Sequence, residues 1–449
     1  MNFSLNIATI GEITDSVCEG DNGSILTQQC RGISTDTRSL GTGEIFVALR
    51  GETFDGHDFL TQAVAQGAIA LIIEENHLGE EELNVPIFRV KDSLEAYQKI
   101  AHWWREQLNI PIIGVTGSVG KTTTKELISA VLNTQGKVLK TRANYNNEIG
   151  VPKTLLEITK EDDFAVIEMA MRGEGEIALL TDIVNPTIGL ITNVGTAHIG
   201  RLGSREAIAR AKCELLANMN PDGVAILNAD NELLMETAGM VWQGKTVSYG
   251  LENGDFQGQI IDDDKIEVNG EIYPLPLQGR HNALNYLGAI ALAHVLELDL
   301  EPLKAGIEVE MPKGRAKRYH LDNDIVILDE TYNAGFESML ASLELLQDTP
   351  GERKIAVLGT MKELGEYSPA LHHQVGEKAE QLGLDMVLIL ADEPATETIA
   401  SGAKGIPTEI FDNHDALLNR VKQIMTKGDR ILFKASNSVG LSAIVDQII

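Results

Sequence analysis

The sequence predicts an α/β protein built as three consecutive α/β domains. Short apolar runs of strand length alternate with helical patterns along nearly the whole chain, which is typical of sheets covered by helices. The length of 449 residues exceeds what a single hydrophobic core organises. The alternation falls into three blocks with short linkers, at 1–86, 87–313 and 314–449. These observations together predict several separate sheets in one chain.

The composition is that of a soluble globular protein. Hydrophobic residues make up 43% and charged residues 23% of the chain. The 37 lysines and arginines against 66 aspartates and glutamates leave a net charge of −29. A surface this acidic repels nucleic acid and anionic membranes, so we expect neither as a partner. A phosphate site must therefore be built locally from a few cations and backbone N–H groups.

Neither the cysteines nor the start of the chain indicates secretion. Cys18, Cys30 and Cys213 are odd in number and have no metal-binding spacing, which favours a reducing cytoplasm. The first residues lack a basic start followed by a long apolar core, so no signal peptide is predicted. The longest apolar runs are well short of the ~20 residues of a membrane span. We expect a cytoplasmic protein that acts as a monomer.

Block 1–86 reads as a small α/β unit. Strand patterns at 43–49 and 68–73 flank a helix pattern at 59–66. Two polar turns, 34–39 and 50–58, each combine Asp with Arg, and the second adds Gly and His. Such residues form turns by themselves, and they also suit a polar ligand. The residues alone leave both interpretations open.

The most informative motif lies in block 87–313, between an apolar strand at 110–115 and a helix that begins near Lys121. Glycines at positions 114, 117 and 120 precede Lys121 and Thr122. Glycines let successive backbone N–H groups turn toward an anion, and the helix N-terminus adds its positive end. The lysine then reaches the outer phosphates, and the threonine hydroxyl ligates Mg²⁺. The strict G-x-x-x-x-G-K-[ST] pattern would place glycine where Val115 stands, but the context favours a phosphate-binding loop over a bare turn.

Strands recur around this loop with helical spacers, which predicts a mostly parallel sheet with helices on both faces. Ligands bind beyond the carboxyl ends of such strands. Polar residues at those ends therefore carry weight, and Glu168, Asn193 and His198 are the ones that stand there. The predicted strands are 137–140, 164–170, 187–194 and 224–228.

The remaining chain predicts an antiparallel segment and then a third α/β block. Residues 256–277 read as antiparallel strands with a hairpin turn at Asn269 and Gly270, and a helix runs from 279 to about 296. The glycine-containing turn 357–365 lacks the G-x-G-x-x-G spacing, so no dinucleotide site is predicted there. The predicted strands of block 314–449 are 325–328, 354–358, 385–390 and 430–434.

Several residues could carry chemistry, and each also has a structural interpretation. Glu168 stands where a metal-binding carboxylate would be, although a solvated strand end has the same pattern. His198 is a single histidine, and Lys212 by itself indicates a lysine on a helix surface. Asn144 and Asn147 are typical turn residues. No Ser/His/Asp, CxxC or HExxH pattern is present, which argues against nucleophilic and zinc chemistry.

Taken together and in order, these stretches resemble the Mur ligase family, the ATP-dependent amide-bond ligases of peptidoglycan precursor synthesis. The family's loop also reads G-x-x-G-x-x-G-K-T, which accounts for Val115. The resemblance spans nearly the whole chain and is strongest to the member that adds D-alanyl-D-alanine to UDP-N-acetylmuramoyl-tripeptide. The matching stretches are 36–38, 43–49, 54–59, 114–123, 144–152, 167–169, 175–177, 197–198, 211–214, 279–285, 314–315, 329–334 and 363–365.

The resemblance implies an N-terminal UDP-binding domain (1–86), a central P-loop ATPase domain with a mostly parallel sheet (87–313) and a C-terminal Rossmann-like domain (314–449). It implies that the tripeptide carboxylate attacks the γ-phosphate of ATP to give an acyl phosphate and ADP. The dipeptide amine then displaces phosphate. A carboxylate is a poor acyl donor until one oxygen becomes a leaving group, so activation comes first. Two anions must be brought together, so Mg²⁺ and fixed cations would carry much of the catalysis.

The resemblance also implies a role for each matching residue near ATP. Lys121 would hold the β- and γ-phosphates and Thr122 one Mg²⁺, while Glu168 and His198 would serve a second Mg²⁺. Lys212 aligns with the lysine that the family carbamylates with CO₂, which turns a cation into a metal ligand. These four side chains, Lys121, Glu168, His198 and Lys212, are the expected catalytic residues. The ATP contacts expected are Gly117, Ser118, Val119, Gly120, Lys121, Thr122, Thr123, Asn282 at adenine, Arg315 at the phosphates and Asp329 at the ribose.

Two further groups are expected to meet the UDP-sugar and the peptide. The first comes from the polar turns of block 1–86, and the second from the asparagine-rich turn after the loop helix and from the 329–334 signature. The expected substrate contacts are Asp36, Arg38, Phe54, Asp55, Asn144, Asn147, Tyr332 and Asn333.

The chain departs from the family pattern in three places. Gly335 follows Ala334 where the family continues Tyr-Asn-Ala-Asn. The turn at 359–361 reads Gly-Thr-Met instead of Gly-Asp-Met, and 434–437 reads Lys-Ala-Ser-Asn instead of Lys-Gly-Ser-Arg. In the family these positions lie near the nucleotide and the incoming dipeptide.

Two other functions fit parts of the sequence. One is a ligase of the same superfamily that adds a single amino acid or attaches glutamate to folate, and the other is an ATP-binding homologue without ligase activity. The Asp-x-x-Tyr-Asn-Ala signature at 329–334 and the lack of an Asp-Asn-Pro-Arg box disfavour the first. The joint presence of Lys121, Thr122, Glu168, His198 and Lys212 disfavours the second. The pattern fits a tripeptide ending in lysine or in diaminopimelate equally.

Overall fold

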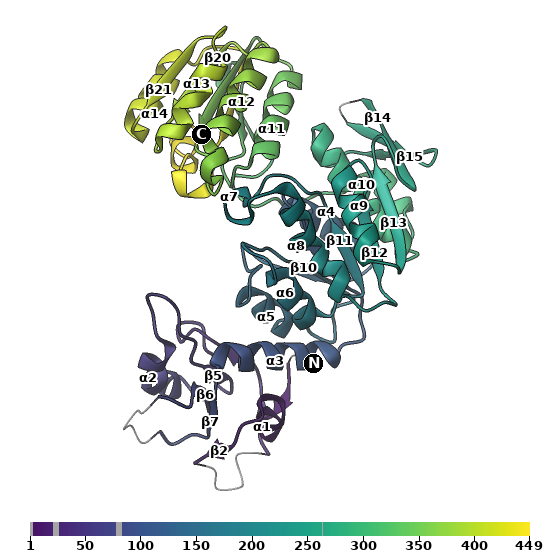
Figure 1. Cartoon of the computed structure of the whole chain (residues 1–449), viewed down its shortest axis with the longest axis vertical. Helices are drawn as coiled ribbons and strands as arrows, with labels where there is room; N and C mark the ends of the chain where they lie inside the picture. Colours follow the sequence, from purple (N-terminus) through teal and green to yellow (C-terminus); the bar gives the residue numbers. More distant parts are fainter. Residues whose placement is uncertain (1–2, 21–26, 78–82, 263) are drawn as a thin grey trace.

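The computed structural model describes residues 3–20, 27–77, 83–262 and 264–449. Three lobes follow one another along the long axis of the molecule, in chain order from the purple N-terminal lobe to the yellow-green C-terminal lobe (Figure 1). Each lobe is built on its own main sheet, and all three sheets contain parallel strand pairs. The structure therefore confirms the predicted α/β class with several parallel sheets.

The N-terminal lobe holds a five-stranded sheet in the order β2-β7-β6-β5-β4, in which only β2 runs antiparallel to its neighbour. β7 (Ile87–Val90) pairs along β6, so the boundary that we drew at residue 86 separates this strand from its own sheet. The remaining elements are β1 (Leu5–Asn6), α1 (Ile7–Thr14), β2 (Cys18–Glu19), β3 (Gln29–Cys30), β4 (Ile33–Ser34), β5 (Ile45–Val47), η1 (Gly56–Phe59), α2 (Leu60–Ala65) and β6 (Ala70–Glu74).

Helix α3 (Ser93–Glu106) joins the N-terminal lobe to the central one. Its Trp104 ring lies 5.0 Å from the Phe3 ring, and its indole N–H donates to the Ile158 carbonyl at 3.0 Å. The Arg105 guanidinium donates to the Asn185 carbonyl at 2.8 Å. Because Trp104 is 3% exposed, it packs in the core and anchors the helix to both lobes.

The central lobe holds a nine-stranded sheet in the order β16-β15-β14-β13-β12-β11-β8-β10-β9. The strands from β9 to β14 pair in parallel, and β14, β15 and β16 form the predicted antiparallel extension. Asn269 and Gly270 both have positive φ, as a tight hairpin turn requires. The strands are β8 (Ile112–Thr116), β9 (Val138–Lys140), β10 (Phe164–Glu168), β11 (Ile188–Ile191), β12 (Val224–Asn228), β13 (Lys245–Gly250), β14 (Phe256–Asp262), β15 (Lys265–Val268) and β16 (Glu271–Pro274).

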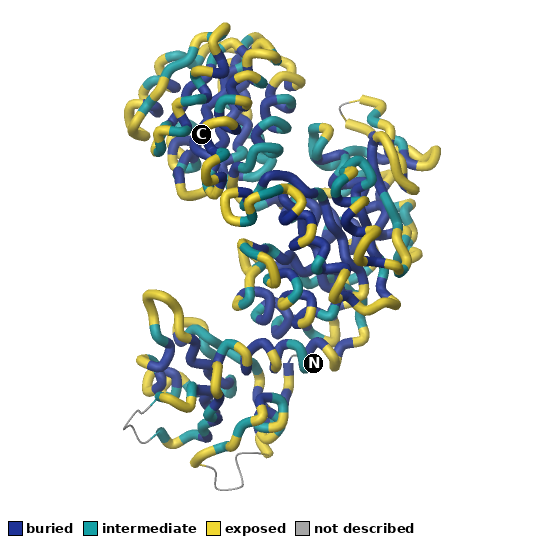
Figure 2. Tube along the Cα trace, viewed as in Figure 1, coloured by how far each residue is buried: buried dark blue, intermediate teal, exposed yellow. Residues whose placement is uncertain are grey.

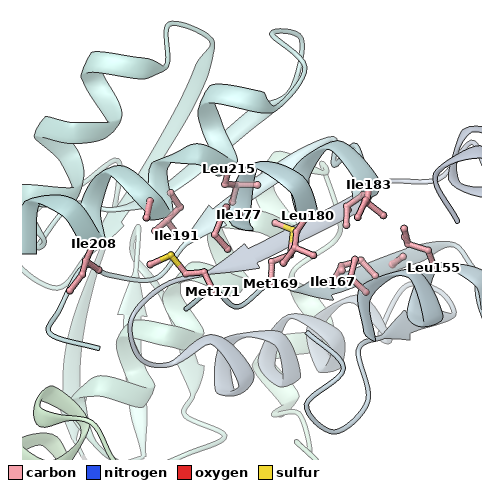
Figure 3. Packing of buried hydrophobic residues seen from close by; sticks show 14 of the residues in the cluster. Leu155, Ile167, Met169, Met171, Ile177, Leu180, Ile183, Ile191, Ile208 and Leu215 are labelled. Carbon is pink, nitrogen blue, oxygen red and sulfur yellow. The ribbon is translucent and has the colours of Figure 1, made fainter. Parts of the chain in front are cut away.

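Helices cover both faces of this sheet, and the tube in Figure 2 is dark blue where they meet it. One face packs against α4 and α10, and the other against α5, α6, α8 and α9. Figure 3 shows the second face, where Ile167 and Met169 of the β10 end pack with Ile177, Leu180 and Leu215. The helices are α4 (Lys121–Leu132), α5 (Gly150–Leu156), α6 (Glu176–Val184), α7 (Ile199–Leu202), α8 (Arg205–Asn218), α9 (Glu232–Val241), α10 (Arg280–Val295) and the 3₁₀ helix η2 (Glu301–Ala305).

The C-terminal lobe holds a six-stranded sheet in the order β17-β18-β22-β19-β20-β21, parallel except for β17. Helices α11, α12 and α13 cover one face, while α14 and α15 cover the other. The elements are β17 (Lys317–Leu321), η3 (Asp322–Asp324), β18 (Ile325–Asp329), α11 (Phe336–Asp348), β19 (Arg353–Gly359), η4 (Gly365–Tyr367), α12 (Ser368–Gln381), β20 (Met386–Leu390), η5 (Pro394–Glu397), α13 (Thr398–Gly402), β21 (Thr408–Phe411), α14 (His414–Ile424), β22 (Asp429–Lys434), η6 (Asn437–Val439) and α15 (Ser442–Val445).

The sequence patterns missed β13, β17 and β21; β17 and β21 are edge strands, whereas β13 pairs with β12 and β14 on its two sides. β21 is only four residues long, and none of its side chains is fully buried. Edge strands of this kind lack the continuous apolar run that marks a strand buried on both faces. In the part of the chain that the structure describes, no helix has both the length and the apolar character needed to cross a membrane.

The central and C-terminal lobes touch through a small set of polar and backbone contacts. The Thr196 amide donates to Glu337 Oε1 of α11 at 2.7 Å, and the Tyr367 hydroxyl donates to the Gly203 carbonyl at 2.9 Å. The backbones of Gly200 in α7 and Gly365 in η4 meet directly, because a Cβ on Gly200 would lie 2.6 Å from the Gly365 nitrogen. Glycine is therefore required where the lobes meet.

We predict that Gly200→Ala forces the two lobes apart at this contact. The added methyl group meets backbone atoms that cannot rotate away, so the lobes must separate or tilt. Small-angle X-ray scattering should show a larger radius of gyration than that of the native protein. Gly239→Ala is the matched control, because a Cβ on this helical glycine meets nothing within 4 Å. Scattering from Gly200→Ala that matches the native curve would contradict the prediction.

Candidate active site

The glycine loop closes the carboxyl end of β8 and ends where α4 begins at Lys121. Gly117 and Gly120 have φ values of 150° and 82°. A Cβ on Gly117 would lie 1.9 Å from Thr192 Oγ1, so a side chain cannot fit there. Val115 lies inside β8, is fully buried and pairs with both neighbouring strands. The loop therefore begins after Val115, which explains why valine is tolerated at that position.

A second segment at the end of β11 holds the loop in shape. The Ser118 amide donates to the Asn193 carbonyl at 3.0 Å, and the Val119 amide donates to Asn193 Oδ1 at 3.0 Å. Thr192 Oγ1 donates to the Val119 carbonyl at 2.6 Å, and the Gly195 amide donates to Ser118 Oγ at 2.8 Å. Asn193, which the sequence marked only as a polar strand end, therefore braces the loop.

Lys121 lies over the loop that precedes it. Its ammonium donates to the Gly117 carbonyl at 2.9 Å and reaches the Ser118 carbonyl at 3.4 Å. Burial lowers the pKa of Lys121, the nearby Glu168 raises it, and the positive charge of Arg315 lowers it further. Lys121 of the central lobe and Arg315, beyond the second predicted boundary, thus act on the same small volume.

Glu168, the last residue of β10, is 2% exposed and faces the α4 side of the sheet. Its Oε1 accepts from Asn146 Nδ2 at 2.8 Å and from Thr122 Oγ1 at 3.2 Å. Its Oε2 is buried without a hydrogen-bond partner and lies 3.8 Å from the ammonium of Lys125. The alternative interpretation of Glu168 as a solvated carboxylate at a strand end is wrong, because its side chain is buried.

Lys125 lies one turn after Lys121 on α4 and is 1% exposed. Its ammonium donates to the Thr141 carbonyl at 2.8 Å and lies 2.9 Å from Glu126 Oε1. Thr141 Oγ1 in turn accepts from the Glu168 amide at 2.9 Å. Sequence reasoning missed Lys125, because a lysine in an amphipathic helix normally signals an exposed face.

Lys212 lies on α8 and is 1% exposed, so the helix-surface interpretation that its local sequence suggests is wrong. Burial lowers its pKa well below the ordinary lysine value, and the positive charge of Lys121 lowers it further. Lys212 therefore lies within electrostatic reach of Lys121, which begins α4 after the glycine loop. An amine in this setting loses its proton readily and becomes nucleophilic.

His198 precedes α7 with a φ of 66°, and its Nδ1 lies 2.5 Å from Glu363 Oε2. The contact lowers the pKa of the Glu363 carboxyl. The sequence placed His198 beside a second Mg²⁺ with Glu168, whereas the contact shown here is with the C-terminal lobe. Within the ranges that the structure describes, no group of three or more His, Cys, Asp or Glu side chains is arranged to hold a metal ion.

The residues expected at the adenine, the phosphates and the ribose come from α10 and from residues 315–329. Asn282 is 3% exposed and donates to the Gln278 carbonyl at 2.7 Å. The Arg315 guanidinium stacks 4.3 Å above the Tyr332 ring, and its Nε is buried without a partner. Asp329 is fully buried; its Oδ1 accepts from the neighbouring hydroxyl of Thr331 at 2.6 Å, whereas its Oδ2 lacks a partner.

The remaining ATP-binding prediction, Thr123, is buried in the first turn of α4. The three departures from the family pattern turn out to be neighbours around Ser436. The Ser436 amide donates to the Thr360 carbonyl at 3.0 Å, and its hydroxyl donates to the Ala334 carbonyl at 3.3 Å. The Lys434 ammonium donates to the Asn333 carbonyl at 3.1 Å. The departures at 335, 360, 435 and 437 therefore lie next to one another in the C-terminal lobe.

The predicted substrate residues of the N-terminal lobe sit in well-formed turns. Asp36 accepts from the Arg38 guanidinium at 2.7 Å, and the Arg38 side chain is 87% exposed. Phe54 is 49% exposed beside Phe59. Asp55 caps η1 by accepting from the His57 amide at 3.0 Å. These residues therefore do form turns, which is one of the two interpretations that the sequence left open. The Arg38 and Phe54 side chains in the same turns remain exposed.

The asparagine turn shows the same pattern. Asn147 Oδ1 accepts from the Gly150 amide at 2.9 Å at the start of α5, and the Asn144 carbonyl accepts from the Asn146 amide at 2.8 Å. Asn146 instead turns its side chain to Glu168. The sequence singled out its two neighbours and missed it, because three asparagines in one turn look alike without the fold.

The fold and the site define a class: an α/β protein of three lobes with a phosphate-binding loop where the central and C-terminal lobes meet. Family models match each lobe, described as "Mur ligase family, catalytic domain" over residues 29–105, "Mur ligase middle domain" over 115–293 and "Mur ligase, glutamate ligase domain" over 314–437. The chain belongs to the Mur ligase family.

One curated relative and two solved structures resemble the chain over nearly its whole length. The chain is 60% identical over 417 residues to the UDP-N-acetylmuramoyl-tripeptide--D-alanyl-D-alanine ligase of Synechocystis sp.. The aligned residues make up 93% of this chain and 91% of that protein. The crystal structure of MurF from Acinetobacter baumannii matches with a TM-score of 0.90 at 30% identity, over 100% and 99% of the two chains. MurF ligase from Thermotoga maritima in complex with ADP matches at 0.82 and 30%, over 94% and 97%.

We predict that Asp55→Asn destabilises the N-terminal lobe in a pH-dependent way. Partial burial raises the pKa of Asp55, but hydrogen bonds from His57 and Arg50 outweigh it and lower the pKa to about 2. The unfolded carboxyl titrates near about 4, so the native stabilisation is full above that pH and is lost as pH falls toward 2.

Urea unfolding at several pH values measures this effect. The difference in unfolding free energy between native protein and Asp55→Asn should be largest at pH 7 and should shrink as the pH drops below 5. Asp58→Asn, which removes an exposed charge from the same turn, is the control and should show a smaller difference at pH 7. A difference that stays constant from pH 7 to pH 3 would argue against an ionised, hydrogen-bonded Asp55.

Proposed function

We propose that this protein is an ATP-dependent ligase that joins D-alanyl-D-alanine to UDP-N-acetylmuramoyl-tripeptide. The products are UDP-N-acetylmuramoyl-pentapeptide, ADP and phosphate. The observation that carries this proposal is the 60% identity, over 93% of the chain, to a ligase of that name. The loop, the buried Glu168 and the buried Lys212 supply the parts that such a reaction needs. The third residue of the tripeptide is left to experiment.

The proposed reaction has two steps. The tripeptide carboxylate oxygen attacks the γ-phosphorus of ATP, the bond to the β-phosphate oxygen breaks, and ADP leaves. The dipeptide amine then attacks the acyl carbon, loses a proton and expels phosphate. Lys121 and Arg315 are the cations that act on the site, so they oppose the repulsion between carboxylate and triphosphate. Asn282 and Asp329 are proposed to hold the nucleoside.

The oxygen donors of the site fit Mg²⁺. Glu168 Oε2 is a buried carboxylate oxygen with no hydrogen-bond partner, and the Thr122 hydroxyl lies beside the other oxygen of the same group. Hard oxygen ligands of this kind suit Mg²⁺ together with substrate phosphates. We propose that Thr122 and Glu168 hold Mg²⁺, with His198 and Lys212 contributing to a second ion. The metal would supply charge neutralisation at the transferred phosphoryl group.

Lys212 is proposed to carry a carbamate. Its lowered pKa raises the share of neutral amine, whose Nζ lone pair can bond to the carbon of CO₂ while a carbon–oxygen electron pair moves to oxygen and a proton leaves. The product is an anion that can ligate a cation where a lysine cannot. The nearby Lys121 ammonium favours that negative charge.

A division into three domains, with the first boundary placed after β7, a cytoplasmic location and a monomeric state form part of the same proposal. The Cys30 and Cys213 thiols are buried, and burial raises the pKa of each to about 12, so they resist oxidation to disulfides. A protein with such thiols suits a reducing compartment. Sedimentation of the purified protein tests the monomeric state.

Phosphate release is the measurement that tests the proposed reaction. Purified protein with ATP, Mg²⁺ and UDP-N-acetylmuramoyl-tripeptide should release phosphate only when D-alanyl-D-alanine is added, and mass spectrometry should detect the pentapeptide. Lys121→Met should lower kcat by about 10²–10³-fold, because it removes a cation from the developing phosphoryl charge. Release that does not depend on the dipeptide would falsify the acceptor assignment.

Lys212→Ala tests the carbamate. We expect it to abolish most activity, whereas Lys427→Ala at an exposed turn should leave activity unchanged. Native protein stripped of CO₂ at low pH should regain activity with bicarbonate. With ¹³C-bicarbonate, the native protein should give a carbamate NMR signal that Lys212→Ala lacks. Full activity of Lys212→Ala, together with no response to bicarbonate, would remove the carbamate from the proposal.

A further inference from the structure

The Glu168 carboxylate is held asymmetrically. Oε1 accepts two hydrogen bonds, from Asn146 Nδ2 and Thr122 Oγ1, while Oε2 accepts none. A carboxylate rotates easily about its last side-chain bond, so donors on one oxygen determine which way the other faces. The shorter of the two bonds is the 2.8 Å bond from Asn146. Asn146 therefore has the larger geometric part in aiming Oε2.

Asn146 is itself fixed on both sides by the backbone. Its carbonyl accepts from the Ala170 amide at 2.8 Å, just beyond the end of β10 that carries Glu168. Its amide donates to the Asn144 carbonyl at 2.8 Å within the asparagine turn. The Asn146 backbone is thus held on both sides, and the turn 144–147 cannot move without moving the donor on Glu168.

We propose that Asn146 is a positioning residue, which aims the Glu168 carboxylate at the metal and ties it to the turn 144–147. The inference rests on the proposed role of Glu168 as a metal ligand. Asn146 touches neither metal nor substrate in this role and acts through Glu168. Groups that orient a metal ligand typically change metal affinity by about 10–100-fold when they are removed.

The structure separates Asn146 from the other neighbours of Glu168. Lys125 faces Oε2 at 3.8 Å, but its ammonium is already bound to the Thr141 carbonyl and paired with Glu126, so it contributes charge rather than direction. Thr122 donates at 3.2 Å and is a proposed metal ligand itself. Asn146 is the remaining donor, and it is half-buried in a turn, where replacement leaves the core intact.

Mn²⁺ binding tests the proposal without depending on turnover. Electron paramagnetic resonance counts free Mn²⁺ in the presence of the protein and a non-hydrolysable ATP analogue. Asn146→Ala, and Asn146→Leu with a similar side-chain volume, should bind Mn²⁺ at least about ten-fold more weakly than native protein. Asn133→Ala, at an exposed position after α4, is the matched control and should bind normally. Thermal unfolding of each variant confirms that it is folded.

A double-mutant cycle with Glu168→Gln shows whether Asn146 acts through the carboxylate. In the Glu168→Gln background, Asn146→Leu should cause no further loss of Mn²⁺ affinity. Native-like Mn²⁺ binding by both Asn146 variants, with Glu168→Gln weakened, overturns this inference alone. A loss that persists undiminished in the Glu168→Gln background also overturns it. Native-like binding by Glu168→Gln itself overturns the proposed metal ligand and the inference together.

Discussion

The site depends on one enclosed carboxylate. An ionised group removed from water costs several kcal/mol unless hydrogen bonds and opposite charges compensate. Glu168 is 2% exposed, and its compensation comes from Thr122 on α4, Asn146 in the asparagine turn and the Lys125 ammonium. Thr122 and Lys125 lie on α4, Asn146 lies in the asparagine turn, and Glu168 itself ends β10. The carboxylate therefore fixes where the loop helix, the end of β10 and the turn stand relative to one another.

Cations balance this carboxylate and also work against each other. The positive charge of Arg315 lowers the pKa of Lys121, and the positive charge of Lys121 lowers the pKa of Lys212. Gathering positive charge in a chain of net charge −29 concentrates the attraction for anions at one place. A triphosphate and a peptide carboxylate are such anions, so the electrostatics agree with the proposed ligase chemistry.

The segment 193–200, which supports the glycine loop, also contacts the C-terminal lobe. Asn193 holds the loop backbone, and Thr196, three residues later, binds Glu337 of α11. His198 then meets Glu363, and Gly200 meets Gly365. One short stretch, 193–200, thus contacts both the phosphate-binding loop and the neighbouring lobe. Movement of that lobe bears directly on the loop, which gives domain motion a physical route to the nucleotide site.

By itself the sequence determined the α/β class, the glycine loop between β8 and α4, the β12 strand and the Asn269–Gly270 hairpin. These follow from local rules, namely side-chain periodicity and the backbone freedom of glycine and asparagine. Only the tertiary structure decided that Lys212 and Lys125 are buried, that β7 belongs to the N-terminal sheet and that Asn146, between two predicted asparagines, binds Glu168. Burial and such pairings depend on segments far apart in sequence, and no local pattern records them.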